Sequence, residues 1–463
     1  MATAIVVGNV IGSGVFVKPA AVARAVPDFG WAMAAWVLLG ALTMCGGLAL
    51  AEVMVMFPKA GGNYVYLREA YGRLFGFIWG WVEFFVIRSA SIAALATIFA
   101  DSLHDILQHP AVRARLGLTI EGPVLGFWPL QGITIVTIVV LALVNARGVR
   151  WGGGLQLVVT LAKIGSLLFI ALLPFGLALR TENSPLHWEY LTAPADKSFS
   201  WLAFGGALIA IQWSYYGWTS LCPVAEEIRT PQRNLPIAII VGIGIIIVLY
   251  LAANLAYALV IPQDEMGRIT GTTVATVFTT RLLGPVGGLV ISSAIALSVF
   301  GAMNGGLLAG PRLLYAMGQD GLAPRILADV HPRYRTPAVA TMVLAVWTSA
   351  LVAIVGVLIQ FQILEGDKNH FDVLSDFAVF GSVLFETMAV ASIFLLRWQR
   401  PDADRPYRCI GYPWTPLVYV LGFSCVLASY AAPGKRFEAL TGLAFALLGA
   451  LVYALFLRRR ATP

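Results

Sequence analysis

The sequence predicts an all-α protein that crosses a membrane many times. Of its 463 residues, 59% are hydrophobic and only 12% are charged, whereas soluble domains contain about 25% charged residues. Apolar runs long enough to cross the hydrocarbon core, which takes about 20 helical residues, recur along nearly the whole chain. They are continuous, whereas the strands of a membrane β-barrel would show short alternating segments. The chain is therefore expected to span the bilayer as helices.

We count twelve apolar runs and expect each to form one spanning helix. They cover residues 2–26, 30–57, 74–103, 127–145, 153–179, 199–228, 235–261, 284–314, 337–360, 371–397, 414–432 and 437–457. The loops between the runs are short, so no separate catalytic domain is expected. After the second run, a turn at residues 58–64 leads into a short surface helix that carries Arg68 and Glu69.

The basic residues indicate how the chain is oriented. With an even number of helices both termini lie on one side, and the loops, helix ends and tail of that side hold eighteen of the 31 Lys and Arg residues. Ten lie on the opposite side, and Lys18, Arg88 and Lys163 lie within runs. Cytoplasmic loops carry the excess of Lys and Arg, so we expect a plasma-membrane protein with both termini in the cytoplasm. The net charge of +7 does not indicate nucleic acid binding, because no basic patch with interleaved aromatic residues is present.

The sequence contains no pattern typical of an enzyme or of a metal site. The five histidines lie in loops or at the ends of runs, and no Ser-His-Asp set, metal-ligand cluster or phosphate-binding loop is found. The cysteines are isolated from one another and are expected to be packing residues: Cys45, Cys222, Cys409 and Cys425. We therefore expect no enzymatic activity, no cofactor and no bound metal ion.

Small or turn-forming residues interrupt two of the runs near their centres. The first run contains Gly12, Ser13 and Gly14, and the sixth contains WSYYGW at residues 213–218. Small residues in membrane helices often serve only close helix packing. Two interruptions that lie five helices apart, however, are typical of a transporter built from two inverted repeats.

The spacing of the interruptions predicts the domain organisation. Helices 1–5, at about residues 1–180, and helices 6–10, at about residues 199–397, are expected to form one transport core over residues 1–400. Residues 401–463 are expected to add helices 11 and 12 and a short cytoplasmic tail.

An unwound segment at membrane depth is tolerable only where it lines a cavity or meets a polar partner, because unpaired backbone groups are costly in hydrocarbon. If the first helix stops near Ile11 and restarts near Val15, the free N–H groups of Ser13, Gly14 and Val15 lie at a positive helix N-terminus. Such an end is suited to bind a carboxylate. The first interruption therefore predicts a site for an anionic group.

The opposite helix ends present carbonyl groups. The half-helices that end near Val10 and Ile11 and at residues 213–216 expose the negative ends of their dipoles, which suit an ammonium group. A carboxylate held at one break and an ammonium shared between both breaks describe an α-amino acid. Glycine at positions 12 and 14 permits close approach of a ligand to the backbone and a positive φ.

The aromatic residues of the second interruption admit two interpretations. Trp213 lies at the rim, where its indole is placed to cover the substrate from outside and to act as a gate. Alternatively, these aromatic side chains are ordinary core residues. The whole segment is expected to line the site: Trp213, Ser214, Tyr215, Tyr216 and Gly217.

Five motifs together resemble the amino acid-polyamine-organocation superfamily, and within it are most similar to the L-type amino acid transporters and their bacterial relatives. The motifs are GNVIGSGVF, PKAGGNYVYLREAYG, IRSAS, WSYYGWTSLCPVAEEIRTPQRNLP and SVFGAMNGGLLAGPRLLYAMGQDGLAPRIL. The resemblance covers residues 4–413. It implies a LeuT-type fold that works by alternating access, with Trp213 as the outer gate. It also implies carboxylate binding at Ser13 and Gly14, and amine binding at the carbonyls of Val10, Trp213 and Tyr216.

Animal L-type transporters carry a cysteine in an outer loop that links them by a disulfide to a glycoprotein partner. Residues 104–126 of this chain contain no cysteine. We therefore expect no disulfide-linked heavy chain, and a monomer in the lipid bilayer would suffice for transport.

Lys163 lies near the middle of the fifth run, where a charge costs at least a few kcal/mol. Burial favours the neutral form, whereas nearby carbonyls or a carboxylate favour the charged form. Lys163 could therefore act as a fixed cation or as a proton-coupling group. The family resemblance implies the first role, in which this lysine replaces a sodium ion that braces helix 1 against helix 8, so transport would be independent of sodium. A purely structural pin is the alternative.

Other polar residues within the runs are weaker candidates for the site. Glu83 and Arg88 are five residues apart rather than the three or four that place side chains on one helical face, so each is expected to pair elsewhere. Asn304 lies in a motif of the eighth run, where it either faces helix 1 or joins two helices by a hydrogen bond.

Glu386 departs from the family pattern, which places an apolar residue at this position. Three interpretations stand open. Glu386 pairs with Lys163 or Arg88, or it exchanges protons, or it faces the cavity and selects a cationic substrate side chain.

The sequence therefore predicts a secondary transporter for amino acids, either an exchanger or a facilitative permease, with neutral amino acids as substrates. The first alternative is a proton-coupled symporter of neutral or cationic amino acids. The second, from another class, is a sensor that binds amino acids without transporting them.

Overall fold

The structure is a computed structural model that describes residues 2–58, 61–117, 122–148, 152–180, 184–193, 198–228, 230–334, 336–363, 369–432 and 434–457. All regular elements in this part of the chain are helices. Nine of them are long and apolar enough to cross a membrane, and one bent helix pair adds a tenth candidate span. The prediction of an all-helical, multi-span membrane protein is confirmed.

The nine long spans coincide with nine of the predicted runs. They are α3 (Phe29–Met56), the span Arg73–Gln108 formed by α5 and α6, α8 (Phe127–Ala146), α9 (Gly152–Ala178), α11 (Pro231–Val260), α14 (Pro285–Gln319), α15 (Ala338–Gln360), α16 (His370–Gln399) and α18 (Arg436–Val452). The bent pair is α1 (Ala2–Val10) and α2 (Gly14–Ala25).

Two predicted runs form shorter helices than expected. The run 199–228 gives α10 (Trp201–Tyr215), followed by a 3₁₀ segment over Trp218–Glu227. The run 414–432 gives α17 (Trp414–Ser429). At about 1.5 Å per residue, α10 alone is too short to cross the hydrocarbon core. The sixth run was expected to continue as a helix after the interruption, but its second half is a 3₁₀ segment and not an α-helix.

Short helices cap the two ends of the bundle. The predicted surface helix after the second run is α4 (Asn63–Tyr71), and α12 (Gln263–Arg268) contacts α2 at the other end of α3. We call these two ends the α4 side and the α12 side. The remaining short helices are α7 (Pro110–Leu116) and α13 (Val274–Leu283).

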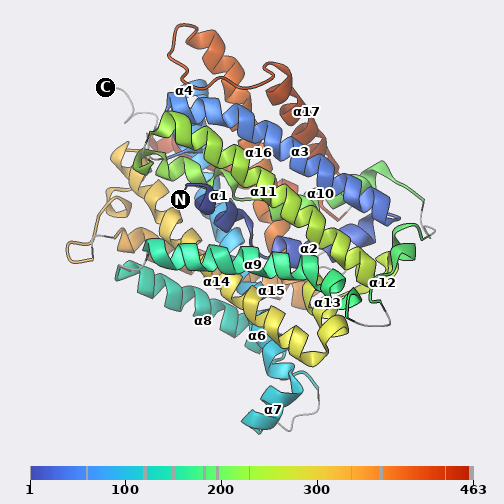
Figure 1. The fold of residues 1–463 in the computed structure, drawn as a ribbon. Helices are drawn as coiled ribbons and strands as arrows, with labels where there is room; N and C mark the ends of the chain where they lie inside the picture. The colour runs from blue at the N-terminus through green and yellow to red at the C-terminus, as the bar shows by residue number, and fades with distance from the viewer. Residues whose placement is uncertain are drawn as a thin grey trace.

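The broken helices lie inside the bundle. Figure 1 shows α1 near the centre of the ribbon, between α11 and α9, and these three helices are in contact. Of the 18-residue apolar window within the span formed by α5 and α6, 78% is buried in the protein, whereas only 11% of the corresponding window is buried in the span that begins with α18. The interrupted elements are therefore surrounded by protein, and α18 is a peripheral helix.

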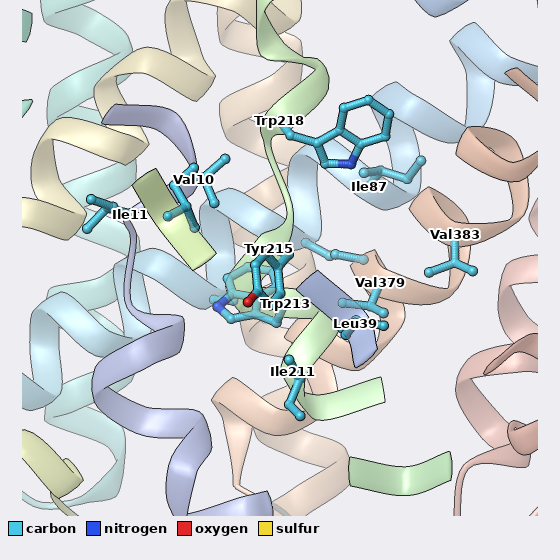
Figure 2. Packing of buried hydrophobic residues seen from close by; sticks show 14 of the residues in the cluster. Val10, Ile11, Leu39, Ile87, Ile211, Trp213, Tyr215, Trp218, Val379 and Val383 are labelled. Carbon is cyan, nitrogen blue, oxygen red and sulfur yellow. The ribbon is translucent and has the colours of Figure 1, made fainter. Parts of the chain in front are cut away.

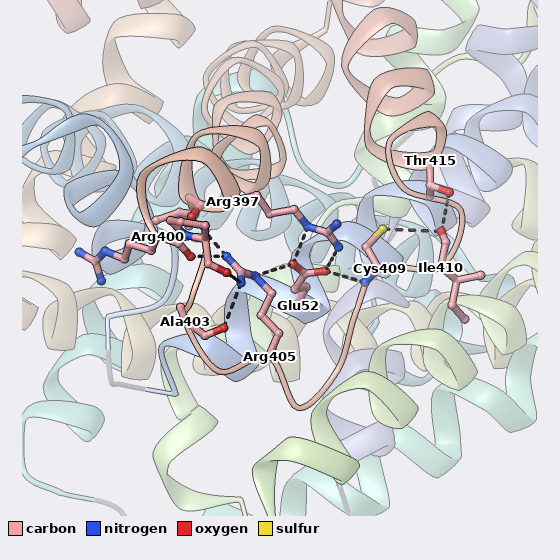
Figure 3. Close-up of polar contacts among 10 residues, drawn as sticks. Glu52, Arg397, Arg400, Ala403, Arg405, Cys409, Ile410 and Thr415 are labelled. Carbon is pink, nitrogen blue, oxygen red and sulfur yellow. Dashed lines mark hydrogen bonds and ion pairs between the residues drawn. The ribbon is translucent and has the colours of Figure 1, made fainter.

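A buried carboxylate fastens the α4 end of α3 to the end of α16. Glu52 is fully buried and accepts hydrogen bonds from Arg397 Nε at 2.9 Å and Arg397 Nη2 at 2.7 Å. It also accepts from the backbone N–H of Cys409 at 2.6 Å and forms an ion pair with Arg405 at 3.4 Å (Figure 3). The cluster holds the segment between α16 and α17 against α3.

Replacing Glu52 with glutamine is expected to lower the melting temperature of the purified protein. Breaking a buried ion pair leaves its partner charge uncompensated and costs about 3–5 kcal/mol. Glu69→Gln is the matched control, because Glu69 pairs with Arg400 at 2.7 Å but is partly exposed, and such surface pairs contribute at most about 1 kcal/mol. Equal melting temperatures for the two variants would contradict the structural role of the Glu52 cluster.

Candidate functional site

The first interruption lies where the sequence predicted it. The last bond of α1 runs from the N–H of Ile11 to the carbonyl of Val7 at 3.0 Å. Gly12 and Ser13 are outside both helices, and the axes of α1 and α2 differ by 44°. The carbonyl of Ser13 accepts the first bonds of α2, so the N–H groups at the start of α2 have no acceptor within the helix.

The second interruption follows α10. Tyr216 is extended, with φ −60° and ψ 142°, and Gly217 has a φ of +106°. This left-handed conformation favours glycine, and a Cβ on Gly217 would lie only 3.0 Å from the carbonyl oxygen of Asn9. The last carbonyls of α10 have no acceptor role within the helix, so this break presents carbonyl oxygens beside the end of α1.

The two interruptions are in direct contact. Figure 2 shows Val10 and Ile11 beside the extended segment that joins Tyr215 to Trp218. Trp213 Nε1 donates a hydrogen bond to Ser13 Oγ at 3.1 Å. The structure therefore brings together the two segments that were expected to line one site.

Tyr250 on α11 joins the same two segments, although no sequence pattern marked this residue. Its hydroxyl lies 3.1 Å from the carbonyl oxygen of Val10 and 2.9 Å from that of Ser214. A single hydroxyl proton can be donated to only one of these oxygens at a time, and each oxygen has two lone pairs. Acceptor capacity therefore remains at the ends of both half-helices.

A cavity of about 280 Å³ opens at the interruptions. Its lining includes all three small residues of the first break together with Trp213, Tyr216 and Gly217. A second cavity of about 390 Å³ shares Tyr216 and Gly217 with the first, and extends to Gly61, Asn63 and Tyr315. The two cavities lead from the interruptions towards the α4 side.

Buried side chains separate the interruptions from the α12 side. Trp213 is buried and meets Phe371 edge-on, with ring centroids 5.6 Å apart. Lys18 Nζ lies 4.6 Å from the Phe371 ring centre, and it is 2.9 Å from Asp372 and 2.8 Å from Ser375. The α2 half-helix is thus fixed to α16 beyond Trp213, a contact that the sequence analysis missed.

Lys163 contacts the first half-helix. The lysine is buried, and its Nζ donates a hydrogen bond to the carbonyl oxygen of Gly8 at 2.9 Å. Gly8 lies two residues before the end of α1. Lys163 therefore links α9 to the carbonyl end of α1.

The prediction that Glu83 and Arg88 pair with other residues is wrong. Arg88 Nη2 lies 2.5 Å from Glu83 Oε1, and the two residues bound a π-helical segment. The wider π turn, whose hydrogen bonds run from i to i+5, brings together side chains that an α-helix would separate. Arg88 also lines both cavities.

For Glu386 and Asn304 the sequence left alternatives open, and the structure contradicts one interpretation of Glu386. Among the residues that the structure describes, Glu386 forms no ion pair with Lys163 or Arg88, and its Oε1 instead accepts from Thr219 at 3.3 Å. Asn304 Oδ1 accepts from Asn145 Nδ2 at 2.8 Å. Asn304 thus joins α14 to α8, in line with the interhelical alternative.

In the part of the chain that the structure describes, buried helix breaks line one cavity among nine or ten candidate spans, and this architecture is typical of a membrane permease. The family model described as amino acid permease matches residues 1–454. The chain belongs to this family, and the resemblance to the amino acid-polyamine-organocation superfamily is confirmed. It is an amino acid transporter and not an enzyme, because the family consists of transporters.

Individual relatives cover most of the chain. The serine/threonine exchanger SteT of Bacillus subtilis is 32% identical over 434 residues, which are 92% of this chain and 89% of SteT. The human cystine/glutamate transporter is 30% identical over 98% of this chain and 83% of its own length. The human large neutral amino acids transporter small subunit 2 is 30% identical over 98% of this chain and 79% of its own length.

Proposed function

We propose that this chain is a sodium-independent secondary transporter of neutral α-amino acids that works by exchange or facilitated permeation. The observation that carries the proposal is the contact between the two interruptions beside one cavity. It supports a site in which the N–H groups at the start of α2 and carbonyl oxygens with remaining acceptor capacity face one ligand. A helix N-terminus and two helix C-termini offer opposite partial charges within the space of one small molecule.

The breaks bind the two groups that every α-amino acid shares. The carboxylate accepts hydrogen bonds from the N–H groups of Ser13, Gly14 and Val15. The ammonium donates to the carbonyl of Val10 and to the carbonyls of Trp213 and Tyr216. Tyr250 orients this arrangement, because its hydroxyl already contacts the carbonyl oxygens of Val10 and Ser214.

The proposed architecture is a LeuT-type fold with twelve spans. Residues 1–400 form the core of two inverted repeats, and residues 401–463 add two helices. Both termini lie in the cytoplasm of a cell whose plasma membrane contains the protein, although the tail after residue 457 lies outside the described part of the chain. A monomer without a disulfide-linked heavy chain performs the transport.

In an alternating-access transport cycle, this conformation corresponds to the state that is open towards the cytoplasm. With the α4 side in the cytoplasm, the cavity is directed inwards, and Trp213, Phe371 and the Lys18 to Asp372 pair close it on the outside. Opening to the outside requires Trp213 to release Ser13. Trp213 therefore acts as the outer gate of the substrate cavity.

Lys163 takes the place of a bound sodium ion. Its ammonium group donates a hydrogen bond to the carbonyl oxygen of Gly8. At this position a cation compensates the negative end of the α1 dipole. Because this charge is part of the protein, transport requires no sodium gradient.

Uptake into proteoliposomes tests the proposed function. Vesicles preloaded with unlabelled alanine, serine or leucine are expected to take up the same labelled amino acid faster than empty vesicles if the protein is an exchanger, and at the same rate if it is a facilitative permease. The rates are expected to be equal in sodium chloride and choline chloride. A strict requirement for sodium, or binding without any flux, would contradict the proposal.

The second candidate is a proton-coupled symporter, and buried Glu386 favours it. Glu386 Oε2 is buried without a hydrogen-bond partner among the described residues, and such a carboxyl group can take up and release a proton. Accumulation of substrate driven by an inward proton gradient would favour this candidate, whereas uptake that only equilibrates the substrate would favour the first.

A further inference from the structure

The second cavity has a polar wall that the helix breaks do not supply. Glu386 from α16, Thr219 from the 3₁₀ segment, and Glu83 and Arg88 all line it. Because this cavity shares Tyr216 and Gly217 with the cavity at the interruptions, it adjoins the space where the α-carboxylate and α-ammonium bind. A long substrate side chain can extend into it.

One acceptor on this wall has no partner. Glu386 is only 2% exposed, its Oε1 accepts from Thr219 at 3.3 Å, and its Oε2 has no hydrogen-bond partner among the described residues. Glu83, by contrast, is paired with Arg88 at 2.5 Å. No basic side chain in the described part of the chain forms an ion pair with Glu386.

A buried carboxyl group that has only neutral hydrogen-bond donors beside it, here Thr219 and Trp218, is costly to ionise. Burial of an ionised group is compensated only when an opposite charge and good hydrogen bonds accompany it. A neutral hydroxyl at 3.3 Å provides little of this compensation. A ligand that carries a charged N–H donor into the cavity would supply both the hydrogen bond and the opposite charge.

We propose that Glu386 forms a subsite for a basic side chain, which extends the substrates of this transporter to amino acids that end in an ammonium or guanidinium group. Glu386 is the specificity-determining residue of this subsite, and Thr219 positions its carboxylate. The proposal rests on the proposed function, because the α-amino and α-carboxyl groups must be bound at the helix breaks for the side chain to reach α16.

Two matched ligand pairs test the subsite on the purified full chain. L-Lysine and L-norleucine differ only in the terminal ammonium, and L-arginine and L-citrulline differ in the charge of the terminal group. Equilibrium binding by titration calorimetry is expected to show each basic ligand binding at least about tenfold tighter than its neutral partner. In Glu386→Gln this preference is expected to disappear, while norleucine affinity changes less than about twofold.

Glu386→Asp keeps the charge and is expected to retain part of the preference, which covers the case in which the glutamine variant folds poorly. Glu69→Gln, on the surface of α4, is expected to retain all of it. An equal affinity for lysine and norleucine in the unmodified protein would overturn the subsite. So would an equal loss for both ligands in Glu386→Gln, or loss of proton-gradient dependence with an unchanged ligand preference. If none of the four ligands binds, the proposed function fails as well.

Discussion

Replacing Gly14 with alanine is expected to lower the initial rate of amino acid uptake about 10- to 100-fold. A Cβ on Gly14 would lie 2.5 Å from the Cα of Ser214 and 2.8 Å from its Cβ. The start of α2 and the end of α10 therefore cannot keep their contact, and overpacking of this kind costs about 1–3 kcal/mol. Because the first N–H groups of α2 form the proposed carboxylate site, their displacement removes substrate binding.

Gly206→Ala is the matched control for this experiment. Gly206 belongs to α10, the same helix as Ser214, and a Cβ on Gly206 would have no neighbour within 4 Å. The control is expected to transport at the normal rate. Uptake should be measured in proteoliposomes with equal amounts of monodisperse protein. Normal uptake by Gly14→Ala would show that the contact between the two half-helices is not needed for substrate binding.

Replacing Lys163 with methionine is expected to lower uptake about tenfold or more, in the presence and in the absence of sodium. Methionine keeps much of the apolar length of lysine but donates no hydrogen bond. The carbonyl oxygen of Gly8 then loses its partner at 2.9 Å, and a buried, unsatisfied acceptor costs about 1–3 kcal/mol. The end of α1 loses the cation that opposes its dipole.

Lys163→Arg separates the charge from the apolar packing. Arginine retains a cationic donor, so uptake is expected to exceed that of the methionine variant even though the larger guanidinium fits less well. Full transport by Lys163→Met without sodium would contradict the role of this lysine as a built-in replacement for a cation.

The sequence was sufficient to predict both helix breaks, because glycine, serine and turn-forming residues stand out within apolar runs. The first break lies within one residue of its predicted position, since α2 begins at Gly14 rather than near Val15. Lys163 was identified for a similar reason. A charge in the middle of an apolar run requires a partner, and that partner proved to be a carbonyl of α1.

Contacts between distant segments could not be predicted in the same way. The pairing of Glu83 with Arg88 depends on a π-helical turn that no residue pattern announces. Tyr250 looks like one more side chain of a long apolar run, and only the packing of α11 against both breaks places its hydroxyl on their carbonyls. The one feature of the sequence that could have identified Tyr250 is its hydroxyl group within an otherwise aliphatic segment.

The sequence also could not predict which neighbouring helix a side chain on a buried helix points to. Asn304 was expected either to face helix 1 or to form a hydrogen bond between helices. The orientation of α14 about its axis directs the Asn304 side chain to Asn145 on α8. Similarly, the partner of Glu386 depends on the path of the 3₁₀ segment that follows the second break, where an α-helix was expected.

An experimental structure of the protein with a bound amino acid tests the central claim most directly. The account predicts that the carboxylate lies within hydrogen-bond distance of the N–H groups of Gly14 and Val15, and that the ammonium contacts the carbonyl of Val10. A ligand bound elsewhere, or helices that run through residues 10–14 or 215–218 without interruption, would contradict it.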